Sequence, residues 1–148
     1  MSDLRQLLER TTISSSAPCR IDMGGTLDIS TFYYPLRYMA PCTFNAAVSM
    51  RTTVTLSPFE KGRVKVSSRG FESADFPAGE APFDHLLGLM FAVAAYFQVH
   101  GLHIRIESAS PPRSALGGSS VAALALTAAL TAAKQGGEKS VPVSVRRM

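Results

Sequence analysis

The sequence has few of the features that mark secreted, membrane or metal-binding proteins. Its 148 residues include two cysteines, Cys19 and Cys42, which are too few for a disulfide scaffold and form no zinc-binding pair. The longest apolar runs, 86–97 and 121–133, are shorter than the roughly 18 residues that a membrane helix needs. The N-terminus has no apolar signal segment. We therefore expect a cytoplasmic protein with reduced thiols, no transition-metal site and no membrane partner.

The charge distribution does not favour nucleic-acid binding. The chain has a formal charge of +4 and a pI near 9.4, but its basic residues are scattered among different segments. No zinc-finger spacing and no aromatic RNA-binding motif accompanies them. A mildly basic surface equally suits anionic small molecules or phosphates, so we expect no nucleic-acid partner. With 46% hydrophobic residues, the length predicts one globular domain with a buried core.

The hydrophobic patterning predicts a mixture of helices and strands. The expected elements are helices over 1–9, 82–99 and 121–134, a short strand followed by a glycine turn within 16–28, and strands over 44–56, 63–67 and 102–107. Lys61-Gly62 is typical of a hairpin tip between the second and third strands. His85 near the start of the middle helix is expected to be a surface or capping residue.

The stretch 107–123 carries the clearest chemical signal, because a strand runs through a Pro/Gly/Ser loop into an apolar helix. At such a junction the first helical N–H groups lack partners and the helix dipole is positive. Gly117 and Gly118 let a ligand approach the backbone, while Ser119 and Ser120 add hydroxyl groups. This predicts an anion site suited to nucleotide phosphates. The alternative is that the serine is an N-cap and the glycines form a turn.

Three other motif classes fit this stretch poorly. A Walker A loop requires the lysine of G-x-x-x-x-G-K-(S/T), which is missing. A nucleophile elbow requires the second glycine of G-x-S-x-G, which is also missing. The Gly-Gly-Ser-Ser core resembles amidase-signature hydrolases, but those continue with a second glycine pair where this chain has Val121-Ala122.

Two segments together resemble the GHMP kinase family. P-P-R-S-A-L-G-G-S-S-V-A at 111–122 resembles its second motif, P-x-x-x-G-L-G-S-S-A-A, in the longer form of the sugar and heptose-phosphate kinase branch. A-P-C-R-I-D-M-G-G-T-L-D at 17–28 resembles the first motif, A-P-G-R-(I/V)-(D/N)-x-x-G-x-x-x-D. The motifs lie in the family's order and about 90 residues apart, and the resemblance covers 13–135. Cys19, Arg113 and Ala115 depart from small or glycine positions of these motifs.

The resemblance implies an α+β fold, the ribosomal protein S5 domain 2-like N-terminal domain of these kinases. That fold has a mixed, largely antiparallel sheet with helices on one face. Residues 1–12 are then an N-terminal helix and 13–148 the GHMP kinase N-terminal domain. The second domain of the family has no counterpart here, so we expect the chain to be truncated relative to the family.

The second motif also implies a nucleotide site. In the family it wraps the ATP phosphates, and one of its serine hydroxyls helps to hold Mg²⁺. The corresponding phosphate loop consists of Leu116, Gly117, Gly118, Ser119 and Ser120. Ser119 is the expected metal-side hydroxyl.

The first motif implies a site for the phosphate acceptor. Asp28 matches the family's sugar-binding aspartate, and Arg20 matches an arginine whose charge steadies the transferring phosphoryl group. Asp22 is either a substrate contact or a structural partner of Arg20. The nearby tyrosines line a sugar pocket or serve as core or lid packing. They are Tyr33, Tyr34 and Tyr38.

The implied activity is ATP-dependent phosphorylation of a sugar or sugar phosphate, with ATP and Mg²⁺ as cofactors. The family's catalytic aspartate, acidic Mg²⁺ ligand and third glycine-rich motif have no match in this sequence. We therefore expect the isolated chain to bind nucleotide weakly and to show no turnover. The alternatives are a mevalonate-type kinase and a non-catalytic nucleotide-binding fragment. The oligomeric state is left open.

Overall fold

The structure is a computed structural model that describes residues 2–22, 34–40, 44–82, 84–111 and 116–135. Its elements are β1 (Ser2–Asp3), α1 (Arg5–Arg10), β2 (Ile13–Asp22), α2 (Tyr34–Leu36), the 3-10 helix η2 (Arg37–Met39), β3 (Asn45–Pro58), β4 (Arg63–Ser68), β5 (Ala74–Pro77), α3 (Gly88–Tyr96), β6 (Val99–His100), β7 (Leu102–Ser108) and α4 (Gly118–Lys134).

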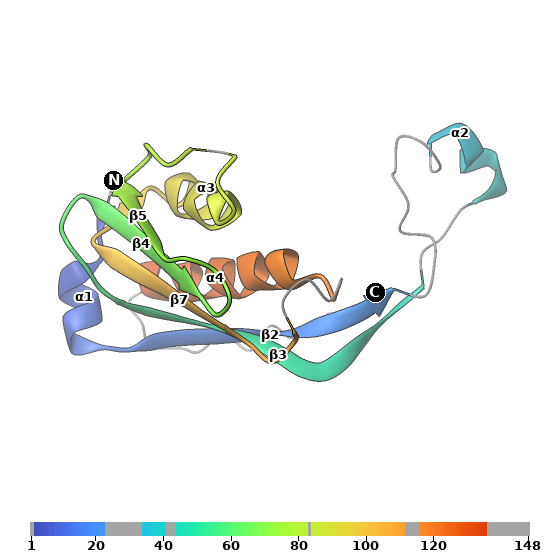
Figure 1. Cartoon of the computed structure of the whole chain (residues 1–148), viewed down its shortest axis with the longest axis horizontal. Helices are drawn as coiled ribbons and strands as arrows, with labels where there is room; N and C mark the ends of the chain where they lie inside the picture. Colours follow the sequence, from blue (N-terminus) through green and yellow to red (C-terminus); the bar gives the residue numbers. More distant parts are fainter. Residues whose placement is uncertain (1, 23–33, 41–43, 83, 112–115, 136–148) are drawn as a thin grey trace.

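Five strands form the main sheet in the order β2-β3-β7-β4-β5. All neighbouring pairs are antiparallel except β4 and β7, which run parallel. Helices α3 and α4 lie over the same face of this sheet, and β2 and β3 extend beyond the other strands as a two-stranded arm (Figure 1). The predicted fold class, a mostly antiparallel α+β domain with helices on one face, is confirmed.

Strand β7 occupies the centre of the sheet because its side chains alternate cleanly between two environments. Leu102, Ile104 and Ile106 are buried under the helices, while Arg105 and Glu107 are exposed on the opposite face. Burying the apolar side of a strand contributes most free energy when the strand has partners on both edges and helices cover that side.

The predicted hairpin at Lys61-Gly62 is wrong, although the turn itself exists. The N–H of Arg63 donates to the carbonyl of Glu60 at 3.1 Å, and Gly62 has a φ of +78°. The two strands that this turn joins do not pair, because β7 inserts between β3 and β4. Turn chemistry is local, and consecutive strands are neighbours only about two-thirds of the time.

The N-terminal helix is shorter than predicted because the first residues pair with another segment. Ser2 donates its N–H to the carbonyl of Gln98 at 2.6 Å, and Leu4 donates to His100 at 3.1 Å. β1 therefore runs parallel to β6, and α1 begins at Arg5. The backbone groups find partners in a distant strand instead of in a helical turn.

Helix α3 spans Gly88–Tyr96, the central half of the predicted 82–99 segment. Before it, His85 Nδ1 accepts a hydrogen bond from the N–H of Leu87 at 3.0 Å, which holds the chain in a turn. The half-buried His85 ring also meets Phe76 and Phe91 edge-on, with centroids 5.6 and 6.1 Å away. His85 therefore holds the turn before α3 and packs against aromatic rings, and the expectation of a surface or capping residue is wrong because no described side chain caps the helix.

Helix α4 supplies much of the core through one apolar stripe. Ala125, Leu126, Ala129 and Leu130 are almost completely buried at i, i+4 spacing, and the helix packs against β2, β3, β7 and α3. Its small alanines allow the helix to lie close to the sheet. Within the described ranges, no helix is long and apolar enough to cross a membrane.

Candidate functional site

The turn before α4 depends on a glycine. Gly117 is the N-cap residue, with φ +73° and ψ +22° in the left-handed region, and its carbonyl accepts the N–H of Val121 at 2.9 Å. Side chains other than glycine are strained in this conformation. Helix α4 consequently starts at Gly118, three residues before its predicted start at residue 121.

No side chain in the described part of the chain caps α4. Ser119 and Ser120 lie in the first turn of the helix and are exposed, as is Gly118. The interpretation of a serine as the N-cap is therefore wrong. The exposed first turn presents N–H groups and hydroxyls together at the positive end of the helix dipole.

A cavity of about 1090 Å³ opens in front of this turn. Residues 116–120, the five predicted phosphate-loop residues, all line it. We call it the loop cavity. Its other walls come from β3, β4, β7, α3 and the loops next to them, and include Thr52, Ser68, Arg69, Gly70, Phe71, Leu86, Leu87, Leu89, Met90, Ile106, Ser108, Ala109, Ser110, Pro111 and Ala122.

The loop cavity combines a polar wall with an apolar wall. The polar wall includes Thr52, Ser108 and Ser110 together with Arg69. Among the residues that the structure describes, no carboxylate pairs with Arg69. The apolar wall includes Phe71 and, on or near α3, Leu86, Leu89 and Met90. Such a site suits a ligand that is anionic at one end and flat or apolar at the other.

The fold brings Arg20 next to the loop. Arg20 lies in β2, directly after the point where the register with β3 shifts between Pro18 and Arg20. A Cβ built on Gly117 would lie 3.9 Å from both Cγ and Nε of Arg20. The Arg20 side chain thus lies close to a residue that follows it 97 positions later in the sequence. The two motifs meet in space through this pair.

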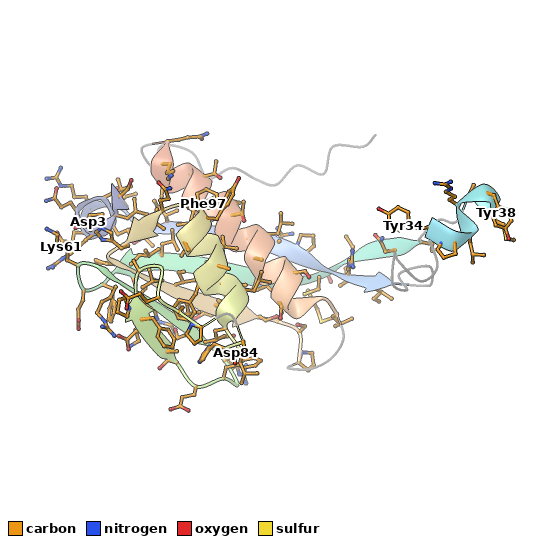
Figure 2. All side chains as sticks on the ribbon, turned by 90° about the horizontal axis from the view of Figure 1, so that it is seen from above. Asp3, Tyr34, Tyr38, Lys61, Asp84 and Phe97 are labelled. Atoms are coloured by element: carbon orange, nitrogen blue, oxygen red, sulfur yellow. The ribbon has the colours of Figure 1, made fainter. Side chains whose placement is uncertain are left out.

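The other predicted acceptor-side residues are less fully described. The backbone of Asp22 pairs with Asn45 at the end of β2. Asp28, Tyr33, Arg113 and Ala115 lie outside the described residues. Tyr34 and Tyr38 lie in α2 and η2 at the end of the arm, 63% and 78% exposed and far from α3 and α4 (Figure 2). The core-packing alternative is wrong for these two tyrosines, and neither lines the loop cavity.

Sequence reasoning missed a chain of polar side chains beneath the cavity. Cys19, Thr52, Ser108 and Ser110 follow one another at hydrogen-bond distances across three neighbouring strands. The sequence gives one indication, since Thr52 is a polar residue on the same side of β3 as the apolar Val54. The spacing of the four residues in the sequence gives no hint that they meet.

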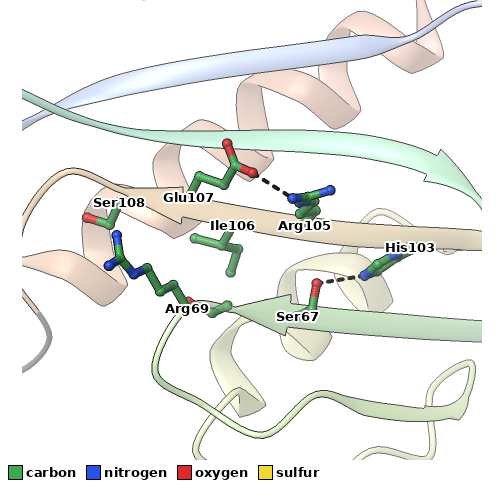
Figure 3. Close-up of a pocket in the computed structure, with 8 residues that line it drawn as sticks. Ser67, Arg69, His103, Arg105, Ile106, Glu107 and Ser108 are labelled. Carbon is green, nitrogen blue, oxygen red and sulfur yellow. Dashed lines mark hydrogen bonds and ion pairs between the residues drawn. The ribbon is translucent and has the colours of Figure 1, made fainter.

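The opposite, helix-free face of the sheet has a second pocket of about 590 Å³, shown in Figure 3. Ser67 Oγ and His103 Nε2 are hydrogen-bonded at 2.7 Å, and Arg105 pairs with Glu107 at 3.0 Å. Partial burial, with the nearby charges of Lys65 and Arg105, lowers the pKa of His103 below its ordinary value of 6.5.

We expect His103 to make stability depend on pH. Because its folded pKa is lowered, the unfolded chain binds more protons as pH falls below about 6.5, and stability falls with it until the folded pKa is passed. His103→Gln should therefore lose less stability than the wild type between pH 8 and pH 5, as measured by urea unfolding. Equal losses of unfolding free energy in the two proteins between pH 8 and pH 5 would contradict this expectation.

The described residues provide no complete metal site, since no group of three or more histidine, cysteine or acidic side chains could hold an ion. The exposed Ser119 hydroxyl at the mouth of α4 fits one ligand of a Mg²⁺ ion that arrives with phosphates. Mg²⁺ commonly binds through substrate phosphates, waters and one or two protein oxygens.

The family model for the GHMP kinases N terminal domain matches residues 85–142, which include α3, β7, the loop and α4. The fold agrees with solved structures of such kinases. The chain is 17% identical to a D-glycero-D-manno-heptose 1-phosphate kinase from Bacteroides thetaiotaomicron, with a TM-score of 0.60 over 79% of this chain and 40% of that one. The resemblance to the GHMP kinases is thus confirmed, by the family model over residues 85–142 and by the fold.

Other similar structures have different specificities. A mevalonate kinase from Methanococcus jannaschii has a TM-score of 0.65 at 12% identity, over 88% of this chain and 43% of that one. A galactokinase from Lactococcus lactis, solved with galactose, has a TM-score of 0.61 at 17% identity, over 88% of this chain and 37% of that one. The chain therefore spans about 40% of the length of these structures. No curated protein matches the sequence significantly.

Proposed function

We propose that this chain provides the nucleotide-binding half of a GHMP-type kinase that transfers phosphate from Mg·ATP to a sugar or sugar phosphate. The observation that carries this proposal is the loop cavity. It is lined by all five residues of the 116–120 loop, at the N-terminus of a long helix that no described side chain caps. Arg20 of the first motif lies next to the same loop.

The α4 terminus is suited to bind the phosphates. The first-turn N–H groups and the Ser119 and Ser120 hydroxyls donate hydrogen bonds, and the helix dipole favours negative charge there. Gly118 leaves the approach open, since a Cβ built on it would have no neighbour within 4 Å. The apolar wall with Phe71 and Met90 suits the nucleoside part of ATP.

Arg20 is proposed to steady the transferring phosphoryl group. Phosphoryl transfer requires mainly positioning and neutralisation of charge, which a fixed guanidinium beside the phosphate loop supplies. The closeness of the Arg20 side chain to Gly117 supports this role. Mg²⁺, held in part by Ser119, would add further neutralisation of the phosphate charge.

The acceptor is proposed to bind on the Arg20 side of the loop, with Asp28 and Asp22 as hydrogen-bond partners of its hydroxyl groups. Carboxylates accept two hydrogen bonds from neighbouring hydroxyls, which suits a sugar. The heptose-phosphate kinase and galactokinase folds support a sugar acceptor. We further propose that the chain alone binds nucleotide without turnover, because none of its residues matches the family's catalytic aspartate.

Removing the Ser119 hydroxyl tests the nucleotide site. Ser119→Ala should weaken Mg·ATP binding about tenfold, because a hydrogen bond to a charged group is lost. The measurement is titration calorimetry with Mg·ATP. Ser67→Ala is the matched control, since Ser67 lies in the pocket on the opposite face and should leave the affinity unchanged. Equal affinities in wild type and Ser119→Ala would remove Ser119 from the site.

A further inference from the structure

Four side chains form a polar chain through the sheet to the loop cavity. Cys19 Sγ lies 3.8 Å from Thr52 Oγ1, Thr52 Oγ1 lies 2.9 Å from Ser108 Oγ, and Ser108 Oγ lies 2.8 Å from Ser110 Oγ. Cys19 and Thr52 are 0% and 1% exposed, and Ser110 is 9% exposed. The polar chain thus begins in the first motif, within the core, and ends at the cavity.

The hydrogen bonds of this polar chain can run in either of two donor-to-acceptor directions. The N–H of Ser110 donates to Ser108 Oγ at 3.2 Å, which occupies one lone pair of that oxygen. Ser108 has a single hydroxyl hydrogen, so it donates either to Thr52 or to Ser110. When Ser108 donates to Thr52, the Ser110 hydroxyl donates to Ser108 and has no hydrogen left for a ligand. When it donates to Ser110, the Ser110 hydrogen is available to a ligand.

An anion in the cavity selects between these directions. Thr52, Ser108 and Ser110 line the same cavity as the 116–120 loop. A phosphate oxygen only accepts hydrogen bonds, so it favours the direction in which Cys19 donates to Thr52, Thr52 to Ser108, and Ser108 to Ser110. Each donor in such a chain polarises the next, and the effect is stronger in a buried setting.

We propose that Ser110 donates a hydrogen bond to a phosphate group of the nucleotide and that Cys19, Thr52 and Ser108 orient this donor. The assignment rests on the proposed nucleotide site and adds a ligand-binding residue outside both sequence motifs. Thr52 is a positioning residue, because it acts through Ser108. Cys19, which stands where the family has a glycine, supplies the thiol at the buried end of the polar chain.

The test uses the whole 148-residue chain and a fluorescent ATP analogue, displaced by either Mg·ATP or Mg·tripolyphosphate. Ser110→Ala should weaken both competitors about tenfold, because it removes the donor to a charged group. Thr52→Val should weaken both about threefold, because Ser108 loses its oriented partner. Thr52→Ser retains the hydroxyl and should match the wild type. Thr53→Val, on the opposite face of β3, is the control and should also match it.

The outcomes separate the possible failures. Equal affinities in wild type and Ser110→Ala would overturn this assignment and leave the proposed nucleotide site in place. A loss seen with ATP but not with tripolyphosphate would also overturn it, because the donor would then face the nucleoside. A purely structural role would lower the unfolding temperature of Thr52→Val without changing tripolyphosphate affinity, again against the proposal. A wild-type chain that binds neither competitor would overturn the proposed function and this assignment together.

Discussion

Replacing Gly118 with leucine is expected to reduce Mg·ATP affinity by at least about a hundredfold, because the side chain would occupy the space in which phosphates approach the helix. Gly118 lines the loop cavity, and a Cβ built on it meets no atom within 4 Å. A β-carbon at this position therefore meets no clash. Leucine also has a higher helix propensity than glycine, by up to about 1 kcal/mol, so the folded state should be at least as stable.

This combination of lost binding and retained stability distinguishes a ligand site from a structural turn. The affinity is measured by titration calorimetry and the free energy of unfolding by urea denaturation. Gly118→Ala is the graded control, because its methyl group obstructs the approach less and should cost only part of the affinity. A Gly118→Leu variant that binds Mg·ATP like the wild type would place the phosphates elsewhere.

Leu126→Ala should have the largest effect on stability, lowering the free energy of unfolding by about 2–5 kcal/mol. Leu126 is 0% exposed within the apolar stripe of α4, and its truncation leaves a cavity between the helix and the sheet. A domain of this size typically has only about 5–15 kcal/mol of stability, so the variant should unfold at a much lower urea concentration.

The same helix offers a matched control for this substitution. Leu124 is 48% exposed, so Leu124→Ala removes the same atoms with little loss of burial. We expect it to cost well under half as much as Leu126→Ala, with similar denaturant slopes in all three proteins. Equal losses in the two variants would mean that α4 does not pack through the face assigned to it.

The sequence was sufficient for features that depend on local pattern. The alternation of apolar and polar residues over 102–107 predicts a strand with one buried face, and β7 has that character. The alanine- and leucine-rich segment predicts α4, and the Gly-Gly-Ser-Ser sequence predicts an open helix terminus. The start of α4 differs from the prediction, because Gly117 in the left-handed region is the N-cap in place of a serine.

Features that depend on distant contacts were not predictable in this way. The pairing of β4 with β7 separates the strands joined at Gly62, and the residues of that turn carry no information about it. Likewise, Thr52 and Ser108 each look like ordinary strand residues, and only the register of β3 against β7 places their hydroxyls together. The proximity of Arg20 and Gly117 follows from the family resemblance but not from the spacing of residues.

The most direct test of the nucleotide site is an NMR titration of the isotopically labelled chain with Mg·ATP. We expect the backbone amide signals of Gly117, Gly118, Ser119 and Ser120 to shift together and to saturate with one dissociation constant. The amide signals of His103 and Arg105, whose side chains line the pocket on the opposite face of the sheet, should remain in place. Shifts confined to that opposite face, or no saturable shift at residues 117–120, would contradict the proposed nucleotide site.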